Sequence, residues 1–244
     1  RVMEIICAYI RQNAPAEDRN ERPFPYLTNP SEIGQRLEDL TQIRGWAYKL
    51  KSPRADVSIA LAVLGRRSDR QIQIERAHRD SRGDFYRLDL GRTCLRRANL
   101  EGLNFANAIL FEAQLEGAYC NDASFKGANL IGAQMIRTAL SRADLTHARL
   151  ASADFSLCVG DQAKFMNCEF SLSFFIDSQL IGARFSYNAD RRTEGFRSYP
   201  ANRLFLVNCS LRNAKIEGDL RDGFELHPRD LNRSMAPEWV HSLS

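Results

Sequence analysis

The sequence has 244 residues, of which 44% are hydrophobic and 26% charged, and its 34 basic and 30 acidic side chains give a net charge of +4. These values exclude a disordered or collagen-like chain. The longest apolar run, 59–64, is much shorter than the about 20 residues that cross a bilayer, and the first residues do not read as a secretory signal. The six cysteines form no CxxC pair, so we expect neither a zinc ribbon nor a disulfide framework, and a reducing compartment is indicated.

Residues 1–82 are predicted to form a helical N-terminal domain or cap. Apolar side chains recur at helical spacing over 2–11 and again over 33–50. A third helix is expected over 52–64, where a Ser-Pro pair opens it and Gly65 ends it.

A five-residue repeat follows, from about 85 to about 187. Of the twenty-one positions at 85, 90 and so on to 185, nineteen are Leu, Phe or Met. Two residues before these, at 88 to 183, twelve of twenty are Ala and six more are Thr, Cys or Ser. The repeat is therefore Ala-x-Leu/Phe-x-x. The large residues expected to build its core include Phe105, Phe125, Leu130, Leu145, Phe165 and Phe185.

A period of five fits neither regular secondary structure. On an α-helix a step of five turns the side chain by about 140° net, so the large residues would be spread around the whole cylinder. In a straight strand an odd step sends successive large residues to opposite faces, and half of them would be exposed to water. The chain must therefore bend at every repeat, with the large and small residues inside the coil.

Units such as Ala98-Asn99-Leu100 and Ala143-Asp144-Leu145 resemble the A(D/N)LXX repeats of the pentapeptide repeat proteins. The resemblance implies a mainly β fold over 83–217: a right-handed quadrilateral β-helix of about five to six coils, with four repeats in each coil. Stacked residues are then twenty apart, and sorting by twenty keeps similar residues together. One such column contains Phe85, Phe105, Phe125, Leu145, Phe165 and Phe185.

The residues after the repeat are expected to finish and cover the solenoid. Residues 188–203 break the period and are predicted to be an inserted loop, because the period resumes one residue out of phase at Leu206, Leu211 and Ile216. An open solenoid end needs a cover. The tail, 218–244, is expected to cap this end or, as the resemblance implies, to form a homodimer.

A second resemblance concerns the helical region. Residues 7–11 and 54–67 are similar to the segment before the repeats in a group of bacterial pentapeptide repeat proteins, in which transmembrane helices often lie further upstream. The helical pattern is already under way at Val2, so we expect the sequence to begin inside a longer protein. The resemblance implies a bacterial cytoplasmic protein, held at the inner face of the cell membrane by a segment before Arg1.

Two outward-facing sets of residues are candidate contact sites. Apolar residues on neighbouring coils form a candidate docking face, which either a partner protein or the chain's own helices and tail would cover: Phe111, Ile131, Ile136, Leu157, Phe174 and Ile176. Arginines of the first coil and the inserted loop are candidate contacts for anions or lipid headgroups: Arg92, Arg96, Arg97, Arg191 and Arg192. The modest net charge disfavours a nucleic-acid binder.

The predicted function is a non-catalytic one. No converging nucleophile, base or metal-ligand set and no cofactor loop is visible, so we expect no enzyme activity, cofactor or metal. The best-known activity in the resembling family is the binding of DNA gyrase by DNA mimicry, which needs an acidic rod. Residues 85–217 instead carry 16 basic and 13 acidic side chains. The prediction is a protein–protein interaction or scaffold module with an unidentified protein partner; the alternative is a topoisomerase-binding protein.

Overall fold

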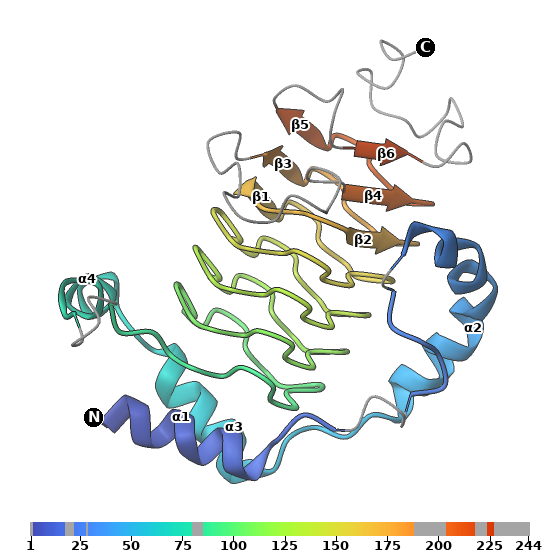
Figure 1. The fold of residues 1–244 in the computed structure, drawn as a ribbon. Helices are drawn as coiled ribbons and strands as arrows, with labels where there is room; N and C mark the ends of the chain where they lie inside the picture. The colour runs from blue at the N-terminus through green and yellow to red at the C-terminus, as the bar shows by residue number, and fades with distance from the viewer. Residues whose placement is uncertain are drawn as a thin grey trace.

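The computed structural model describes residues 2–17, 22–27, 29–79, 85–187, 204–217 and 224–226. The repeat region winds into a β-helical solenoid, and the described helices all precede it (Figure 1). They are α1 (Val2–Asn13), a 3-10 turn at Pro30–Glu32, α2 (Ile33–Lys49), α3 (Ala55–Gly65) and α4 (Asp69–Ala77).

Parallel β-bridges between residues twenty apart fall into four columns, which are the four sides of each coil. We number the sides by their first bridge: side 1 begins with Asp89–Ile109, side 2 with Cys94–Gln114, side 3 with Asn99–Tyr119 and side 4 with Asn104–Ser124. The predicted twenty-residue coil is therefore confirmed.

Regular strands occur toward the C-terminal end of the solenoid. They are β1 (Lys164–Cys168), β2 (Ser173–Ile176), β3 (Arg184–Tyr187), β4 (Leu204–Val207), β5 (Lys215–Glu217) and β6 (Phe224–Leu226). Strands β1, β3 and β5 continue side 4, whereas β2, β4 and β6 continue side 2. Because β6 pairs with β4, the ladder extends beyond the boundary that was expected at 217.

The chain bends because each repeat ends in a tight turn. In the repeat at Leu95, the Ala98 amide donates to the Leu95 carbonyl at 3.0 Å, and Arg97 has a φ of +52°. A positive φ at the third residue is the requirement of a type II turn. The same conformation recurs every five residues, so each large side chain is turned back into the coil.

The core is the stack of large repeat residues. The predicted core residues are at most 1% exposed: Phe105, Phe125, Leu130, Leu145, Phe165 and Phe185. Near the C-terminal end the aromatic rings stack from coil to coil, with centroids 4.5 Å apart for Phe155 and Phe175 and 4.9 Å for Phe165 and Phe185. Rings on different sides meet edge to face, which aromatic pairs favour.

Polar residues at the small positions are satisfied by the backbone. The Thr93 hydroxyl donates to the Leu90 carbonyl at 2.7 Å, and the Ser178 hydroxyl donates to the Phe155 carbonyl at 2.8 Å. A buried hydroxyl without a partner would be costly, so these bonds explain why Thr and Ser can replace Ala inside the coil.

The inserted loop changes the spacing of the ladder. Ser173 pairs with Leu204 and Phe185 with Ile216, so the offset grows from 20 to 31 residues. Residues 188–203 lie outside the described residues, but the residues on either side rejoin the same sides of the solenoid. The offset of 31 is eleven more than the usual 20, and eleven is one more than two repeats of five. The sequence period therefore resumes one residue out of phase.

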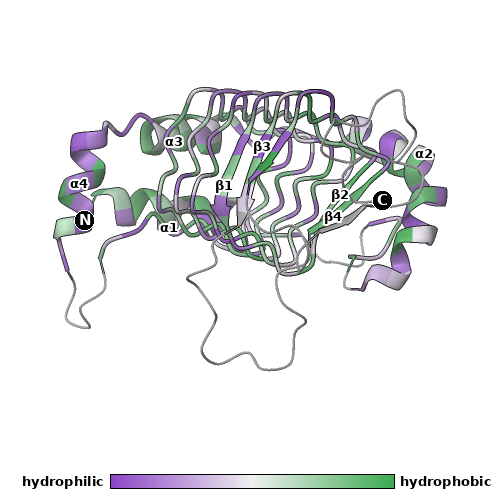
Figure 2. Cartoon of the chain, turned by 90° about the horizontal axis from the view of Figure 1, so that it is seen from above, coloured by the Kyte–Doolittle hydropathy of each residue, from purple (hydrophilic) through white to green (hydrophobic). Residues whose placement is uncertain are grey.

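The helices take up three different positions around the solenoid. Buried residues of α1 and α3, among them Ile10 and Leu61, join the core and cap its first coil. Helix α2 lies along side 2, and α4 lies on the opposite flank (Figures 1 and 2). Helix α3 begins at Ala55 instead of at 52, because Arg54 before it has a ψ of 153°, outside the helical range. Within the described residues, no helix is long and apolar enough to cross a membrane.

Candidate functional site

Side 2 of the solenoid is covered by the residues that connect α1 to α3. We call the described part of this connection (14–17, 22–27 and 29–49) the arm. It starts as an added edge of the ladder, because the Cys94 amide donates to the Ala14 carbonyl and the Ala16 amide to the Arg92 carbonyl, both at 2.8 Å. The arm runs along side 2 and returns through α2 (Figure 1).

Most of the predicted docking face lies under the arm. Phe174 and Ile176 are fully buried against Leu27, Ile33 and the Leu37 and Leu40 side chains of α2. Ile136 and Leu157 are buried against Phe24 and Ile43. These four residues are therefore not an open docking face. They pack in clusters separate from the core of the coil, and the arm is what covers them, because apolar side chains there would otherwise face water.

The other two residues of the predicted face lie outside the arm. Phe111 and Ile131 are partly buried on side 1, and the Arg92 guanidinium lies 5.3 Å from the centre of the Phe111 ring. This stacking partly covers the ring. They do not form a patch with the four residues under the arm.

Buried charges connect the arm to side 2. Arg22 of the arm forms an ion pair with Glu116, and Arg36 Nη2 lies 3.1 Å from Asp154 Oδ2. Glu116 also pairs with Arg96, whose Nε is 3.3 Å from Glu116 Oε2. Burial lowers the pKa of Arg22 to about 10. Breaking an ion pair that is buried away from water is costly, because it leaves an uncompensated charge. These pairs therefore fix the position of the arm on side 2.

The predicted anion-binding arginines are engaged within the molecule. Arg92 pairs with Glu112 at 2.9 Å, Arg96 with Glu17 and Glu116, and Arg97 donates to the Leu50 carbonyl at 3.1 Å. Arg96 is only 5% exposed, so it does not offer a surface charge. Arg191 and Arg192 lie outside the described residues. Arg96 is therefore held between the arm and the ladder, whereas the Arg92 side chain remains 69% exposed beside Glu112.

An open groove lies on the other flank, between α4 and the corner of sides 4 and 1. Its volume is about 750 Å³. Arg67, just before α4, holds this helix against the first coil: its guanidinium pairs with Glu75 of α4 at 2.5 Å and donates to the Asn104 and Ala106 carbonyls at 3.0 Å. The wall of the groove is therefore fixed by buried contacts.

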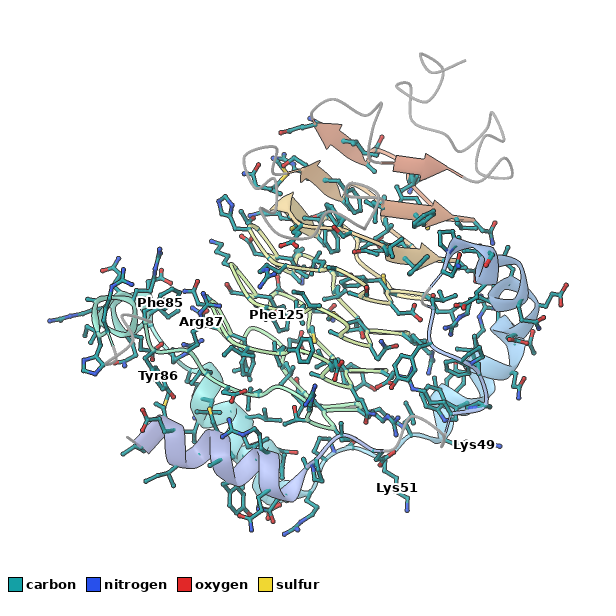
Figure 3. All side chains as sticks on the ribbon, viewed as in Figure 1. Lys49, Lys51, Phe85, Tyr86, Arg87 and Phe125 are labelled. Carbon is teal, nitrogen blue, oxygen red and sulfur yellow. The ribbon has the colours of Figure 1, made fainter. Side chains whose placement is uncertain are left out.

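Basic side chains outnumber acidic ones around this groove. Its lining contains Arg76, Arg87, Lys126 and Arg149, against Asp69 and Glu169. Arg149 pairs with Glu169 at 3.0 Å, and Lys126 Nζ lies 3.3 Å from Asp144 Oδ2. The Arg87 guanidinium stacks on the Phe85 ring at 4.4 Å, at the edge nearest α4 (Figure 3). Small and polar residues of successive coils form the floor, among them Ala106, Ser124, Gly127 and Thr146. The groove is suited to hold an anionic ligand by charge and hydrogen bonds.

Sequence reasoning missed this groove, because nothing in the period shows where α4 lies. The signals for α4 itself were present: Ser68 caps the helix by accepting from the Gln71 amide at 3.2 Å. Among the described residues, no group of His, Cys, Asp or Glu could hold a metal ion. The groove offers binding contacts rather than a set of reacting groups.

Comparisons with known proteins identify the five-residue repeat. A family model described as Pentapeptide repeats (8 copies) matches residues 84–119, 108–146 and 140–175. No curated protein matches the sequence.

Several solved structures resemble the solenoid. HetL, a pentapeptide repeat protein involved in heterocyst differentiation regulation in the cyanobacterium Nostoc sp. strain PCC 7120, is 22% identical; the match covers 55% of this chain and 71% of HetL, with a TM-score of 0.26. A pentapeptide repeat protein of the Arabidopsis thaliana thylakoid lumen is 27% identical over 41% of this chain and 56% of its own, with a TM-score of 0.25. QnrB1, a plasmid-mediated fluoroquinolone resistance protein, is 20% identical over 60% of this chain and 78% of its own, with a TM-score of 0.30.

Proposed function

We propose that this chain, which belongs to the pentapeptide repeat proteins, is a non-catalytic scaffold that binds an acidic segment of a partner protein in the groove beside α4. The observation that carries the proposal is the excess of basic side chains around an open groove with a fixed wall. The arm already covers side 2, so the predicted docking face there is occupied in this structure.

The extent of the groove favours a peptide over a small ion. Its floor runs from Asn104 through Ser124 and Thr146 to Asn167, which belong to four successive coils. At about 4.8 Å per coil this is roughly 14 Å, or about four residues of extended chain. Asparagine and threonine side chains along the floor supply hydrogen bonds for a peptide backbone. Arg76 attracts its carboxylates, together with Lys126, whose side chain stays 59% exposed beside Asp144.

Charge reversal in the groove tests this function. We expect Arg76→Glu with Lys126→Glu to abolish the capture of the partner by the full chain, in proximity labelling followed by titration of the identified partner. Arg212→Glu is the matched control, because Arg212 is exposed and lies outside the groove. If the groove variant and the control recover the same partner equally well, the proposal is wrong.

A topoisomerase-binding function is the alternative, and the surface charges disfavour it. Acidic side chains of the solenoid are paired with basic ones from coil to coil, as in Arg142–Asp122 at 2.6 Å and Arg149–Glu169 at 3.0 Å. A DNA mimic needs a continuous acidic stripe, which such pairing does not supply. Inhibition of gyrase supercoiling by sub-micromolar protein would overturn the scaffold proposal.

Other properties are proposed on the resemblance alone. They are the right-handed winding with about five to six coils, a bacterial and cytoplasmic location with membrane association, and a homodimer or cap formed by 218–244. Apart from β6, the tail lies outside the described residues. Analytical ultracentrifugation of the chain with and without its tail tests the homodimer.

A further inference from the structure

The two helices that cap the solenoid present apolar side chains outward as well as inward. On α3, Val57, Leu61 and Leu64 are buried in the core, whereas Ile59 on the outer face is 64% exposed and Val63 is 48% exposed. A helix that is apolar all round is normally buried on all sides. Helix α3 is largely green in Figure 2, and among the described residues none covers its outer face, although its composition indicates such a contact.

Helix α1 extends this outer surface. Val2 and Ile5 are 69% and 68% exposed, and Tyr9, one turn further on, is also exposed. Their spacing places them on one stripe, opposite the buried Cys7 and Ile10. Helix α1 packs on α3, and the Tyr9 hydroxyl donates to Asp56 Oδ2 at 2.5 Å.

These outer residues form one feature, which we call the cap face: Val2, Ile5, Tyr9, Ile59 and Val63. Among the described residues, five of the nine large apolar side chains that are exposed belong to it. Scattered single apolar residues need no explanation, but a concentration on two adjoining helices marks a contact surface. The cap face lies at the end of the solenoid away from β5 and β6 (Figure 1).

Basic residues flank the cap face and indicate the class of its partner. Exposed Lys51 and Arg54 precede α3, and exposed Arg66 follows it. The Lys51 side chain points away from the solenoid at the same end as α1 (Figure 3). The acidic Asp56 is engaged by Arg54 at 2.6 Å and by Tyr9. Apolar side chains with basic neighbours are typical of helices that lie in the surface of an anionic bilayer.

A second copy of the chain fits this surface less well. A two-fold contact would bring Lys51 and Arg66 of both copies to the same small interface, where like charges repel. A stable dimer also buries about 800 Å² on each partner, which is more than five partly exposed side chains supply. Lipid headgroups carry the complementary charge and need no such area of matched shape.

We infer that the cap face lies on an anionic lipid surface, with Ile5 and Ile59 inserted at the level of the headgroups and Lys51 and Arg66 in contact with phosphates. This inference rests on the proposed membrane association and names the surface that would make it. It does not depend on the groove beside α4, which lies on a different part of the molecule. The solenoid would then stand on the membrane, with its sides open to partners.

Sedimentation of the chain with vesicles tests the inference. We expect binding to vesicles of phosphatidylcholine and phosphatidylglycerol, weaker binding to pure phosphatidylcholine, and a loss of about tenfold or more on Ile5→Asp with Ile59→Asp. Both positions are exposed, so the double variant should keep the thermal midpoint of the wild type. Ile74→Asp on α4 is the matched control, since Ile74 is 55% exposed and lies off the cap face.

Three results would overturn the inference: no binding to either vesicle, equal binding by the double variant, or a dimer in solution that the double variant dissociates. If the wild-type chain does not bind vesicles but still captures a partner through the groove, the lipid contact is wrong and the proposed function stands. If Arg76→Glu with Lys126→Glu abolishes capture of the partner but leaves vesicle binding unchanged, the groove and the cap face are independent sites.

Discussion

Glu116 is the residue whose replacement tests the attachment of the arm most directly. Its carboxylate is fully buried between Arg22 of the arm and Arg96 of the first coil, with 3.3 Å from Glu116 Oε2 to Arg96 Nε. At an effective dielectric constant of about 20, one such pair attracts by roughly 5 kcal/mol. Glu116→Gln keeps the shape of the side chain and removes this attraction, leaving two buried cations short of a partner.

We expect Glu116→Gln to lower the free energy of unfolding by about 3 kcal/mol, the lower part of the range for breaking a buried ion pair. The loss is limited because Arg22 keeps its bond to Gln134 Oε1 at 3.0 Å and Arg96 keeps its pair with Glu17. Urea denaturation followed by circular dichroism measures the change.

Glu112→Gln is the control for this prediction. Glu112 pairs with Arg92 at 2.9 Å, also across twenty residues, but the two side chains are 28% and 69% exposed. Exposed pairs contribute at most about 1 kcal/mol. If Glu116→Gln costs no more than Glu112→Gln, the buried pairs do not stabilise the arm and the reasoning fails.

Three further outcomes follow from the coil itself. Phe125→Ala should cost about 3 to 5 kcal/mol in urea denaturation because its ring is fully buried, while Lys126→Ala should cost almost nothing; similar losses would contradict the five-residue phase. Gly102→Val should cost about 1 to 2 kcal/mol through its φ of +64° alone, since nothing lies within 4 Å of an added Cβ; an unchanged midpoint would argue against the turn. Burial raises the pKa of the Cys158 thiol to about 12, so it should stay unreactive to a disulfide reagent at pH 8 until the protein is denatured, and rapid labelling of folded protein would contradict its position.

The solenoid could be predicted from the sequence because the residues within each repeat are sufficient to determine how the chain bends there. A large residue such as Leu130 and a small one such as Ala128 must both lie inside, and only a coil that turns every five residues allows this. The inserted loop could also be predicted, since the sequence itself shows that the five-residue period resumes one residue out of phase at Leu206. The local pattern is sufficient for this prediction, because the parallel bridges of the solenoid join residues that are one coil apart.

The positions of the helices could not be predicted in the same way. Helices α2 and α4 are generic amphipathic helices, and their places depend on pairs that are far apart in sequence. Arg22 meets Glu116, and Arg67 meets the carbonyl of Asn104. No spacing rule connects such residues, so the groove beside α4, which is made by this placement, was not visible in the sequence.

Because the arm covers side 2, an outward apolar residue of the coil does not by itself indicate a partner protein. Phe174 and Ile176 point away from the coil, and physics requires that something cover them, but an arm of the same chain meets that requirement as well as a partner does. They therefore carry no information about a partner once α2 is in place. Ile5 and Ile59 face the same requirement and remain exposed after every described segment has been placed. In a solenoid wrapped by its own helices, the uncovered apolar residues of the helices, rather than those of the coil, are where a partner surface should be sought.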